Sequence, residues 1–283
     1  METKGVVVVT GAGSGIGRAA AERLTSLGAD VLVCADLNVE AAKDTAAMCS
    51  NIERSDNSKC SASAHAIDVR DEASIDSFIA QVAERHGRID VLVNTAGTAV
   101  SKRTLIRDTS LTEWRRLDDE HNIGCFLLTR AALRVMDRQD AIILSPAMAN
   151  RSPVRGTIVM LTSMVSEGPV LGAGNYNAAK CAAKGMVQTA AIENAARGIR
   201  INAVAPSWVS TPMGEKFIKG CGQDTYRDML GDIPMGRLAT PGEIADAVAF
   251  LASPASSYVN GHTLVVDGGA SVTWTNTPFG SKS

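Results

Sequence analysis

VVVVTGAGSGIG, residues 6–17, is the stretch that decides the fold. The run of valines is typical of a parallel strand that is buried on both faces. The glycines follow in the order G-x-x-x-G-x-G, with Gly11, Gly15 and Gly17 in the three places and Gly13 between them. Small residues let the backbone approach a pyrophosphate, and the amino end of a helix offers that group free N–H donors. The stretch therefore predicts a strand, a phosphate-binding turn and the start of a helix.

The rest of the chain alternates short apolar runs with helix-length amphipathic stretches. The predicted strands are Val6–Thr10, Val31–Ala35, Ala64–Val69, Val91–Thr95, Thr157–Leu161, Ile201–Ala205 and Thr263–Val266. The predicted helices are Ile16–Leu27, Asn38–Met48, Ala73–Arg85, Leu111–Met136, Tyr176–Ala196 and Pro241–Ala252. Seven strands that alternate with helices predict an α/β protein of the Rossmann type, with a doubly wound seven-stranded parallel sheet and helices on both faces.

The domain organisation is simple. No linker divides the chain and no internal repeat is present, so we expect a single dinucleotide-binding and catalytic domain over residues 1–275. Long irregular segments are often lids or binding loops. We expect a substrate lid at about residues 211–238 and an insertion at about residues 137–155, for which a plain surface loop is an equal alternative. Residues 276–283 read as a flexible tail.

Composition and charge exclude several kinds of partner. The chain has 283 residues, a formal net charge of −2 and no run of basic residues, so we expect neither a nucleic acid nor a membrane as a partner. No apolar run approaches the roughly 20 residues of a membrane helix, and the first residues do not read as a signal peptide. We therefore expect a cytoplasmic protein. The six cysteines form no C-x-x-C pair and have no histidine at ligand spacing, which predicts reduced thiols and no metal site, with a reactive thiol as the alternative.

Asp36 ends the second predicted strand and lies 19 residues after Gly17. An acidic residue about 20 residues beyond the glycines accepts hydrogen bonds from the 2′-hydroxyl of an adenosine ribose and repels a 2′-phosphate. Leu37 rather than a basic residue follows it, and Arg18 is the one basic residue beside the glycine turn. The sequence therefore predicts NAD rather than NADP as the cofactor. An N-cap for the following helix is the alternative role of Asp36.

Tyr176 and Lys180 stand four residues apart in the sequence YNAAK, so on a helix they share one face. A nearby ammonium group stabilises a phenolate, and such a tyrosine can give or take the proton of a hydroxyl while a hydride moves on the carbon. Ser163 follows the fifth predicted strand, where its hydroxyl can hydrogen-bond to a substrate oxygen. For the Tyr-Lys pair alone, a half-buried tyrosine beside a lysine that reaches solvent is the alternative.

In their joint order these motifs resemble the short-chain dehydrogenase/reductase family. The resemblance spans almost the whole chain and rests on TGAGSGIG at residues 10–17, Asp36, Asp68-Val69, NTAG at residues 94–97, Ser163, YNAAK at residues 176–180, Ala205-Pro206 with Thr211, and NGHTLVVDGG at residues 260–269. It implies that Tyr176 is the general acid/base and that Ser163 and Lys180 are its catalytic partners. It also implies a homodimer or homotetramer formed through the two predicted helices over residues 111–136 and 176–196.

The resemblance implies contacts along the whole cofactor. Asp68 and Val69 would bind the adenine. Val209 and Thr211 would meet the carboxamide, and Lys180 would also hold the nicotinamide ribose. The cofactor-binding residues that it implies, together with those of the glycine turn, are Gly11, Gly13, Ser14, Gly15, Ile16, Gly17, Asp36, Leu37, Asp68, Val69, Asn94, Ala96, Gly97, Tyr176, Lys180, Pro206, Val209 and Thr211.

The chain departs from the family pattern in four places. Thr95 stands where the family usually has a second asparagine, Ser207 stands in the usual Pro-Gly turn, and the segment before the fifth strand is long. The fourth departure concerns the family's catalytic asparagine, which usually precedes a glycine by three residues and follows a tryptophan by seven. Counting from Gly124 and from Trp114 leads both times to His121.

Three interpretations of this position follow. His121 takes the role of the asparagine and holds a water that relays protons to Lys180, or the helix shifts by one residue and Asn122 does so. The agreement of the two counts favours His121. The third interpretation is a packing histidine with a dispensable relay.

The leading hypothesis is an NAD(H)-dependent oxidoreductase that interconverts a secondary alcohol and a ketone on a fairly apolar small molecule. The expected apolar wall of its pocket consists of Met164, Val165, Val170, Leu171, Trp208 and Phe217. One alternative is a non-redox reaction on the same scaffold, such as dehydration, isomerisation or cyclisation, which His121 keeps open. The other is a cofactor-binding protein without turnover. The sequence leaves the substrate itself open.

Overall fold

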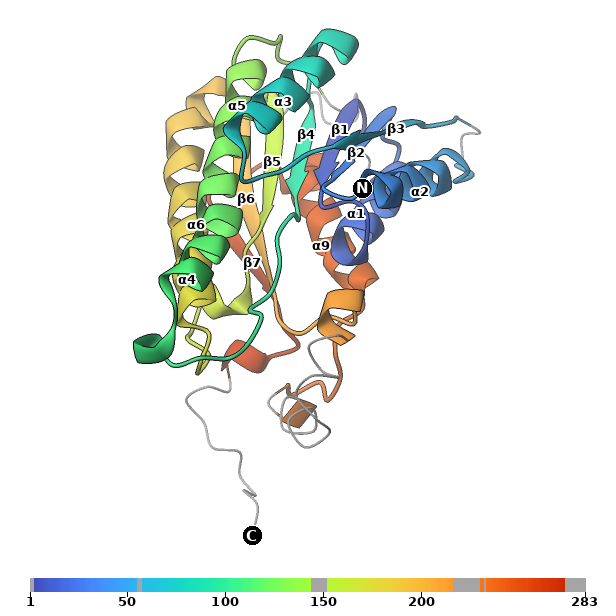
Figure 1. Ribbon diagram of the computed structural model, residues 1–283. Coiled ribbons are helices and arrows are strands. Elements are labelled where there is room, and N and C mark those ends of the chain that lie inside the picture. The colour runs from blue at the N-terminus through green and yellow to red at the C-terminus, as the bar shows by residue number, and fades with distance from the viewer. Residues whose placement is uncertain (1–2, 55–57, 144–151, 216–229, 232, 273–283) are drawn as a thin grey trace.

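The structure is a computed structural model that describes residues 3–54, 58–143, 152–215, 230–231 and 233–272. Seven parallel strands form one sheet in the order β3-β2-β1-β4-β5-β6-β7 (Figure 1). The strands are β1 (Val6–Thr10), β2 (Val31–Asp36), β3 (Ser61–Ala66), β4 (Val91–Asn94), β5 (Gly156–Leu161), β6 (Ile199–Pro206) and β7 (Thr263–Val266). Successive strands are added toward one edge of the sheet from β1 to β3 and toward the other edge from β4 to β7. Open α/β sheets bind ligands at the place between β1 and β4 where this order reverses.

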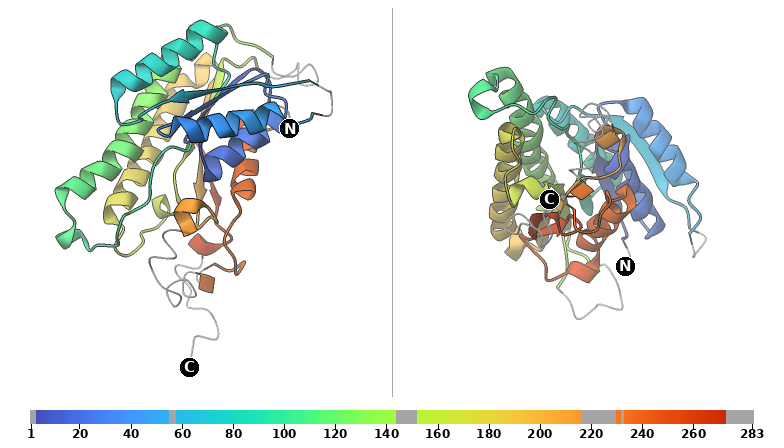
Figure 2. Two further views of the ribbon diagram at one scale, coloured as in Figure 1. Left: turned by 45° about the vertical axis from the view of Figure 1, so that its right-hand side comes forward. Right: turned by 90° about the horizontal axis from the view of Figure 1, so that it is seen from below.

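Helices cover both faces of the sheet (Figures 1 and 2). The α-helices are α1 (Gly15–Ser26), α2 (Val39–Ser50), α3 (Glu72–His86), α4 (Leu111–Asp118), α5 (Gly124–Met136), α6 (Gly174–Asn194) and α9 (Pro241–Ala252). The π-helix η2 (Asp119–Ile123) joins α4 to α5, and short 3-10 helices are η1 (Ile106–Asp108), η4 (Met164–Ser166), η5 (Ala195–Arg197), η6 (Pro254–Ser256) and η7 (Ala270–Val272). None of the helices in the described ranges combines the length and apolar character needed to cross a bilayer. The predicted Rossmann-type fold is confirmed.

The valines of β1 explain why both faces are covered. Successive side chains of a strand point to opposite faces. Val7 and Val9 pack into the core beneath α1, α2 and α9, while Val6 and Val8 pack into the core beneath α3, α5 and α6. All four are buried, so each face of this strand needs a layer of helices.

The third strand begins and ends earlier than predicted. The apolar signal placed it at Ala64–Val69, but β3 spans Ser61–Ala66. It lies at the edge of the sheet, and its side chains are half-buried or exposed, so it needs no apolar run. Ile67 and Val69 are buried just after the strand, and their apolar character comes from the core that they cover there.

The predicted helix over residues 111–136 is interrupted. A π-helical turn separates α4 from α5, and the backbone N–H of Gly124 bonds to the carbonyl oxygen of Asp119. A Cβ on Gly124 would lie 2.8 Å from the carbonyl oxygen of Val69, so a glycine lets α5 approach the segment after β3. Periodicity alone does not show such a bulge, because one additional residue hardly disturbs an apolar stripe.

The two irregular segments are described only in part. In the insertion, residues 144–151 lie outside the described ranges, and its ends pair through Ile142 and Val154. Of the predicted lid, residues 211–215, 230–231 and 233–238 are described. The predicted tail at residues 276–283 lies outside the described residues.

Candidate functional site

The glycine turn forms a cradle at the amino end of α1. A Cβ on Gly17 would lie 2.0 Å from the carbonyl oxygen of Gly11, and Gly11 has a φ of 72°. The N-cap residue Ser14 makes no side-chain bond to the first turn of the helix, so its first amide groups face the cavity without a side-chain cap. Such donors fit the oxygens of a pyrophosphate.

Thr95, the departure from the family's second asparagine, closes this turn from the side of β4. Its hydroxyl donates to the carbonyl oxygen of Thr10 at 2.7 Å. Asn94 was predicted to contact the cofactor, but it does not line the cavity. It is buried, and its Oδ1 accepts hydrogen bonds from the Thr10 hydroxyl (2.7 Å) and from the Ala96 backbone N–H (3.1 Å). Asn94 therefore holds the ends of β1 and β4 together behind the cavity wall.

Asp36 lies at the carboxyl end of β2 and lines the cavity. Its carboxylate accepts from the backbone N–H groups of Gly13 (2.8 Å) and Asn38 (2.9 Å). The N-cap of α2 is Asn38, so Asp36 does not have the alternative capping role. The guanidinium of Arg18 bonds to the Gly13 carbonyl oxygen (2.6 Å) and the Thr45 hydroxyl (3.1 Å).

Asp68 lies in the segment after β3 and lines the cavity beside Val69. Its carboxylate pairs with Arg70 at 2.6 and 2.9 Å. The Arg70 guanidinium is the main reason that the pKa of Asp68 lies below its usual value. Arg70 also lines the cavity, and it was not among the site residues predicted from the sequence.

One cavity of about 620 Å³ joins most of the predicted site. The predicted site residues that line it are Gly11, Ser14, Gly15, Ile16, Gly17, Asp36, Leu37, Asp68, Val69, Ala96, Gly97, His121, Ser163, Tyr176, Lys180, Pro206, Val209 and Thr211. Gly13, Asn94 and Asn122 do not. The amide of Asn122 donates to Asp118 at 3.0 Å instead.

The prediction of the apolar side chains that line the cavity is only partly correct. Met164, Val165, Val170 and Trp208 line the cavity, whereas Leu171 does not line it and is 81% exposed. Leu171 lies in the turn over residues 171–172 that leads into α6. Phe217 lies outside the described residues.

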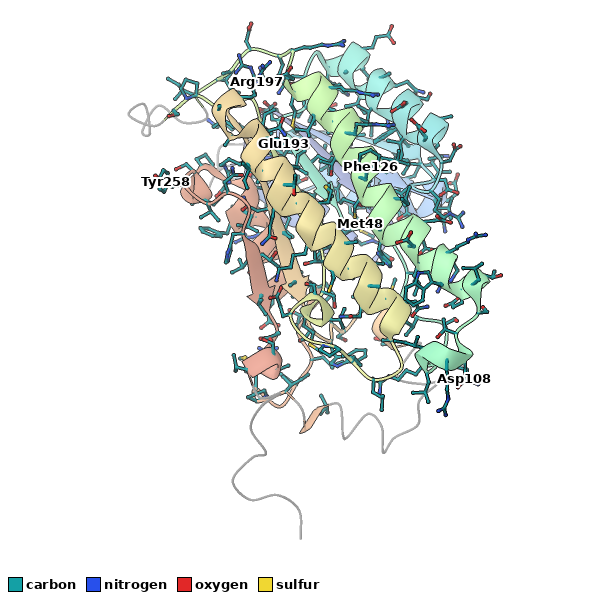
Figure 3. All side chains as sticks on the ribbon, turned by 90° about the vertical axis from the view of Figure 1, so that its left-hand side faces the viewer. Met48, Asp108, Phe126, Glu193, Arg197 and Tyr258 are labelled. Carbon is teal, nitrogen blue, oxygen red and sulfur yellow. The ribbon has the colours of Figure 1, made fainter. Side chains whose placement is uncertain are left out.

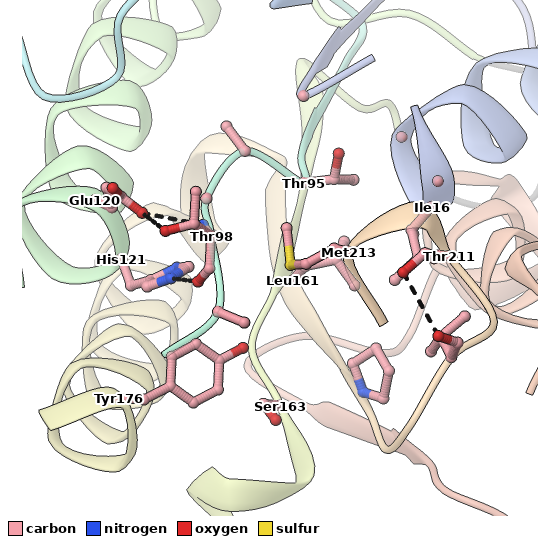
Figure 4. A pocket seen from close by; sticks show the side chains of 18 of the residues that line it. Ile16, Thr95, Thr98, Glu120, His121, Leu161, Ser163, Tyr176, Thr211 and Met213 are labelled. Atoms are coloured by element: carbon pink, nitrogen blue, oxygen red, sulfur yellow. Dashed lines mark hydrogen bonds between the residues drawn. The ribbon is translucent and has the colours of Figure 1, made fainter. Parts of the chain in front are cut away.

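The catalytic candidates come together from two elements. Ser163 follows β5, and Tyr176 and Lys180 stand on the first turns of α6 (Figure 4). Lys180 is buried, its Nζ donates to the carbonyl oxygen of Leu161 at 2.8 Å, and it lies 5.5 Å from the centre of the Tyr176 ring. A phenol, a hydroxyl and an ammonium group thus meet in one cavity.

His121 lies on the π-helical turn and packs against this group. Its ring centre is 5.1 Å from that of Tyr176, with the rings nearly perpendicular. The Nε2 atom bonds to the carbonyl oxygen of Thr98 at 2.7 Å, and because a carbonyl oxygen only accepts, Nε2 carries the proton. Nδ1 is buried and has no hydrogen-bond partner among the described residues. A Cβ on Gly97 would lie 2.6 Å from it, so the absence of a side chain there makes room for the imidazole.

The surroundings keep the imidazole of His121 neutral. Burial lowers its pKa well below the usual value of 6.5, and the positive charges of Lys180 and Arg116 lower it further. The hydrogen bond to Thr98 opposes this shift in pKa but does not outweigh the burial.

A group of bonded polar residues beside His121 was not predicted from the sequence. Thr98, Glu120 and Arg116 bond to one another there, and Thr98 and Glu120 line the cavity. The spacing of Arg116 and Glu120, four residues apart on a predicted helix, is a signal for an ion pair. Only the fold shows that Thr98 lies within reach of both.

These residues fit a nicotinamide dinucleotide. A cradle without side chains faces the amino end of α1, a carboxylate lies 2.8 Å from the backbone of that turn, and the catalytic candidates line the same cavity. The residues that would hold it are those of the glycine turn, with Asp36 at the adenosine end and Lys180 at the nicotinamide end.

Comparisons with known proteins agree with this arrangement. A family model described as enoyl-(acyl carrier protein) reductase matches residues 11–271. Short-chain dehydrogenase fogB of Aspergillus ruber is 41% identical over 273 residues, which cover 96% of this chain and 99% of that protein. Meso-2,3-butanediol dehydrogenase of Serratia marcescens is 37% identical over 266 residues, 94% of each chain.

A solved structure shows the same fold. The crystal structure of levodione reductase matches 97% of this chain and 100% of its own with a TM-score of 0.84 and 29% identity. Together with the dehydrogenase relatives, this makes the protein an oxidoreductase that acts on CH–OH groups. The chain therefore belongs to the short-chain dehydrogenase/reductase family.

Proposed function

We propose that the protein is an NAD(H)-dependent oxidoreductase that interconverts a secondary alcohol and a ketone on a fairly apolar small molecule. One observation carries this proposal: Tyr176, Lys180 and Ser163 line the same cavity as the glycine turn and Asp36. The apolar side chains of Met164, Val165, Val170 and Trp208 also line that cavity, which supports an apolar substrate.

Each polar side chain has a separate task in the proposed reaction. NAD(H), when bound, supplies the hydride chemistry. The phenolate oxygen of Tyr176 takes the proton from the alcohol, and in the reverse direction the phenol hydroxyl donates a proton to the ketone oxygen. The hydroxyl of Ser163 donates a hydrogen bond to the same substrate oxygen. The ammonium group of Lys180 lies 5.5 Å from the Tyr176 ring centre, where it stabilises the phenolate.

We propose that His121 takes the place of the family's catalytic asparagine. Its hydrogen bond to Thr98 and its contact with the Tyr176 ring support this placement, whereas Asn122 bonds to Asp118 on its own helix. The lowered pKa of His121 indicates that the ring acts as a neutral group. A proton relay would then pass along hydroxyl groups and water rather than through a charged imidazole.

The preference for NAD is a proposal that Asp36 supports. Its carboxylate lies against the Gly13 backbone at the edge of the cavity, where a 2′-phosphate would meet a negative charge. Arg18 is bound to the Gly13 carbonyl oxygen and the Thr45 hydroxyl. We expect Asp36→Asn to weaken NADH binding and to narrow the preference for NADH over NADPH by about tenfold, or roughly 1.4 kcal/mol. Titration of both reduced cofactors by fluorescence measures it, and tighter binding of NADPH to the unchanged protein would contradict the assignment.

The proposed activity is tested with NAD and a panel of secondary alcohols, followed by the absorbance of NADH. The panel contains sterols, polyols, polyketide-like compounds and butane-2,3-diol, the last taken from the name of a relative. We expect Tyr176→Phe to lower kcat by about 10²- to 10⁴-fold, the usual contribution of a general acid/base, while NADH still binds.

The matched control is Tyr258→Phe. Tyr258 is fully exposed, and its hydroxyl is not part of the cavity, so this variant should retain the turnover of the unchanged protein. NADH binding without turnover on any alcohol or ketone would favour the non-redox or cofactor-binding alternatives. Equal activity of Tyr176→Phe and the unchanged protein would refute the role of Tyr176.

We also propose a homodimer or homotetramer formed through the face of α5 and α6. Apolar side chains are exposed on or beside this face, which Figure 3 shows from outside. They are Leu111, Ile123, Phe126 and Ile192. Exposed apolar side chains on one face of a protein are typical of an interface, and the measurement is sedimentation at several protein concentrations.

A further inference from the structure

Thr98 lies in the cavity wall directly after Gly97, and all three of its polar groups bond to one turn of helix (Figure 4). Its backbone N–H and its hydroxyl donate to Oε2 of Glu120 at 3.0 and 2.6 Å. Its carbonyl oxygen accepts from Nε2 of His121 at 2.7 Å. Two consecutive residues of the π-helical turn therefore determine both the position and the orientation of this piece of the wall.

Glu120 is a carboxylate that is only 9% exposed, and Arg116 supports it from the preceding turn. The Arg116 guanidinium lies 3.3 Å from Oε1 of Glu120 and also donates to the Thr98 hydroxyl and to the carbonyl oxygen of Ala99. Glu113 holds the same guanidinium at 2.7 and 2.9 Å. A buried carboxylate is costly unless it is paired and hydrogen-bonded, and here every partner belongs to the cavity wall or to the helix that carries His121.

The hydrogen bond between His121 and Thr98 bears on which nitrogen of the imidazole is protonated. Because the Thr98 carbonyl only accepts, it selects the tautomer with the proton on Nε2. If Thr98 moves, that selection is lost and the imidazole can turn away from the ring of Tyr176, which lies 5.1 Å away. The charged groups around the imidazole are Lys180, which lies beside Tyr176, and the pair of Arg116 and Glu120, which bonds to Thr98.

We propose that Glu120 is a positioning residue: together with Arg116 it holds Thr98 in the cavity wall, and Thr98 in turn holds the Nε2-protonated tautomer of His121 against Tyr176. The effect on turnover rests on the proposed function, whereas the effect on the tautomer does not. Glu120 acts through Thr98 and His121 and does not itself touch the reacting atoms.

The first test is kinetic. We expect Glu120→Ala to lower kcat by about ten- to a hundredfold, as small misplacements of a catalytic group do, with the KM for NAD changed by less than about twofold because the glycine turn is untouched. Glu120→Gln keeps an oxygen that accepts from Thr98 and should restore most of kcat. The matched control is Glu72→Gln, which removes a carboxylate that pairs with Arg130 on the outside of α5 and should leave kcat unchanged.

The second test needs no turnover. Nitrogen-15 NMR of the histidine rings distinguishes the two tautomers, and His121→Asn identifies the His121 signals by their loss. We expect His121 of the unchanged protein to be entirely in the Nε2-protonated tautomer, and His121 of Glu120→Ala to show a mixture of the two tautomers. If Glu120→Ala does not fold, Thr98→Val decides, because it loses the hydroxyl shared by Glu120 and Arg116 but keeps the backbone groups.

The outcomes separate the two proposals. A single unchanged tautomer in the folded Glu120→Ala variant, or in Thr98→Val when the former does not fold, overturns the positioning role. An unchanged kcat in folded Glu120→Ala does the same. Absence of turnover in the unchanged protein, with NADH bound and the tautomer dependent on Glu120, supports the positioning role and counts against the proposed reaction alone.

Discussion

The imidazole of His121 is enclosed by the carbonyl of Thr98, the backbone of Gly97 and the ring of Tyr176. A second proton would have to go to Nδ1, which is buried and has no acceptor among the described residues. The nearby Lys180 adds positive charge and lowers the pKa further. The residue type alone permits titration near neutral pH, but this position does not favour it.

This environment predicts a dependence of stability on pH. The unfolded chain binds a proton at His121 near pH 6.5, whereas the folded protein does so only at lower pH. The unfolded state therefore binds more protons below pH 6.5, and the contribution of His121 to stability falls by up to about 1.4 kcal/mol per pH unit as the pH is lowered.

Urea unfolding of the unchanged protein and of His121→Asn, at a series of pH values between about 5 and 8, measures this effect. The asparagine variant does not titrate in this range and serves as the reference. We expect the difference in the free energy of unfolding to move in favour of the variant below pH 6.5. Two parallel curves would show that His121 is protonated equally in the folded and unfolded states.

At the scale of elements, the π-helical turn between α4 and α5 is the feature that brings His121 to the strand ends. Its contact with the segment after β4 depends on Gly97, which has a φ of 139° and carries no side chain where the imidazole lies. A Cβ on Gly97 would come within 2.2 Å of Cε1 of His121. The π-helical turn can pack against this segment only because the large side chain of His121 meets a glycine there.

We therefore expect Gly97→Ala to destabilise the protein by about 1–3 kcal/mol, the usual cost of overpacking, with an additional cost from the left-handed backbone. His121→Ala in the same chain should recover part of this loss, because it removes the ring that the new methyl group meets. A double-mutant cycle on the free energy of unfolding isolates the coupling. Equal losses from Gly97→Ala with and without the imidazole would contradict the packing argument.

At the scale of the whole molecule, a buried arginine joins the amino end of β6 to the carboxyl end of α9. Arg200 on β6 donates to the carbonyl oxygens of Ser256 (3.0 Å), Leu251 (3.1 Å) and Ser253 (3.2 Å) and to the Thr157 hydroxyl (3.2 Å). The structure gives it no carboxylate partner within the described residues. Burial lowers the pKa of this guanidinium to about 10, so it remains charged at neutral pH and lies at the negative carboxyl end of α9.

Arg200→Met should destabilise the protein by about 3 kcal/mol, because the variant leaves several buried carbonyl oxygens without donors. The control is Arg23→Met, which removes a more exposed ion pair between α1 and α9 and should cost less than about 1 kcal/mol. Denaturant unfolding of both variants measures the difference. Equal losses would mean that the buried hydrogen bonds of Arg200 contribute little.

The local sequence was sufficient for the sheet and for most of the residues that line the candidate site. The alternation of apolar runs and helical stretches determines a parallel α/β sheet, since a strand such as β1, with all five residues buried, needs helices on both faces. The positions of Gly17, Asp36 and Tyr176 also follow from sequence, because strand ends meet at one edge of such a sheet.

The tertiary structure alone decided the bounds of β3, the π-helical turn between α4 and α5, and the network of Thr98, Glu120 and Arg116. Each depends on contacts between residues that are distant in the chain, such as the one between Gly124 and Val69. Periodicity reports which side of an element is buried but not which partner it meets. For the same physical reason the sequence placed His121 in the helix, and only the fold showed that its imidazole is buried, neutral and held by Thr98.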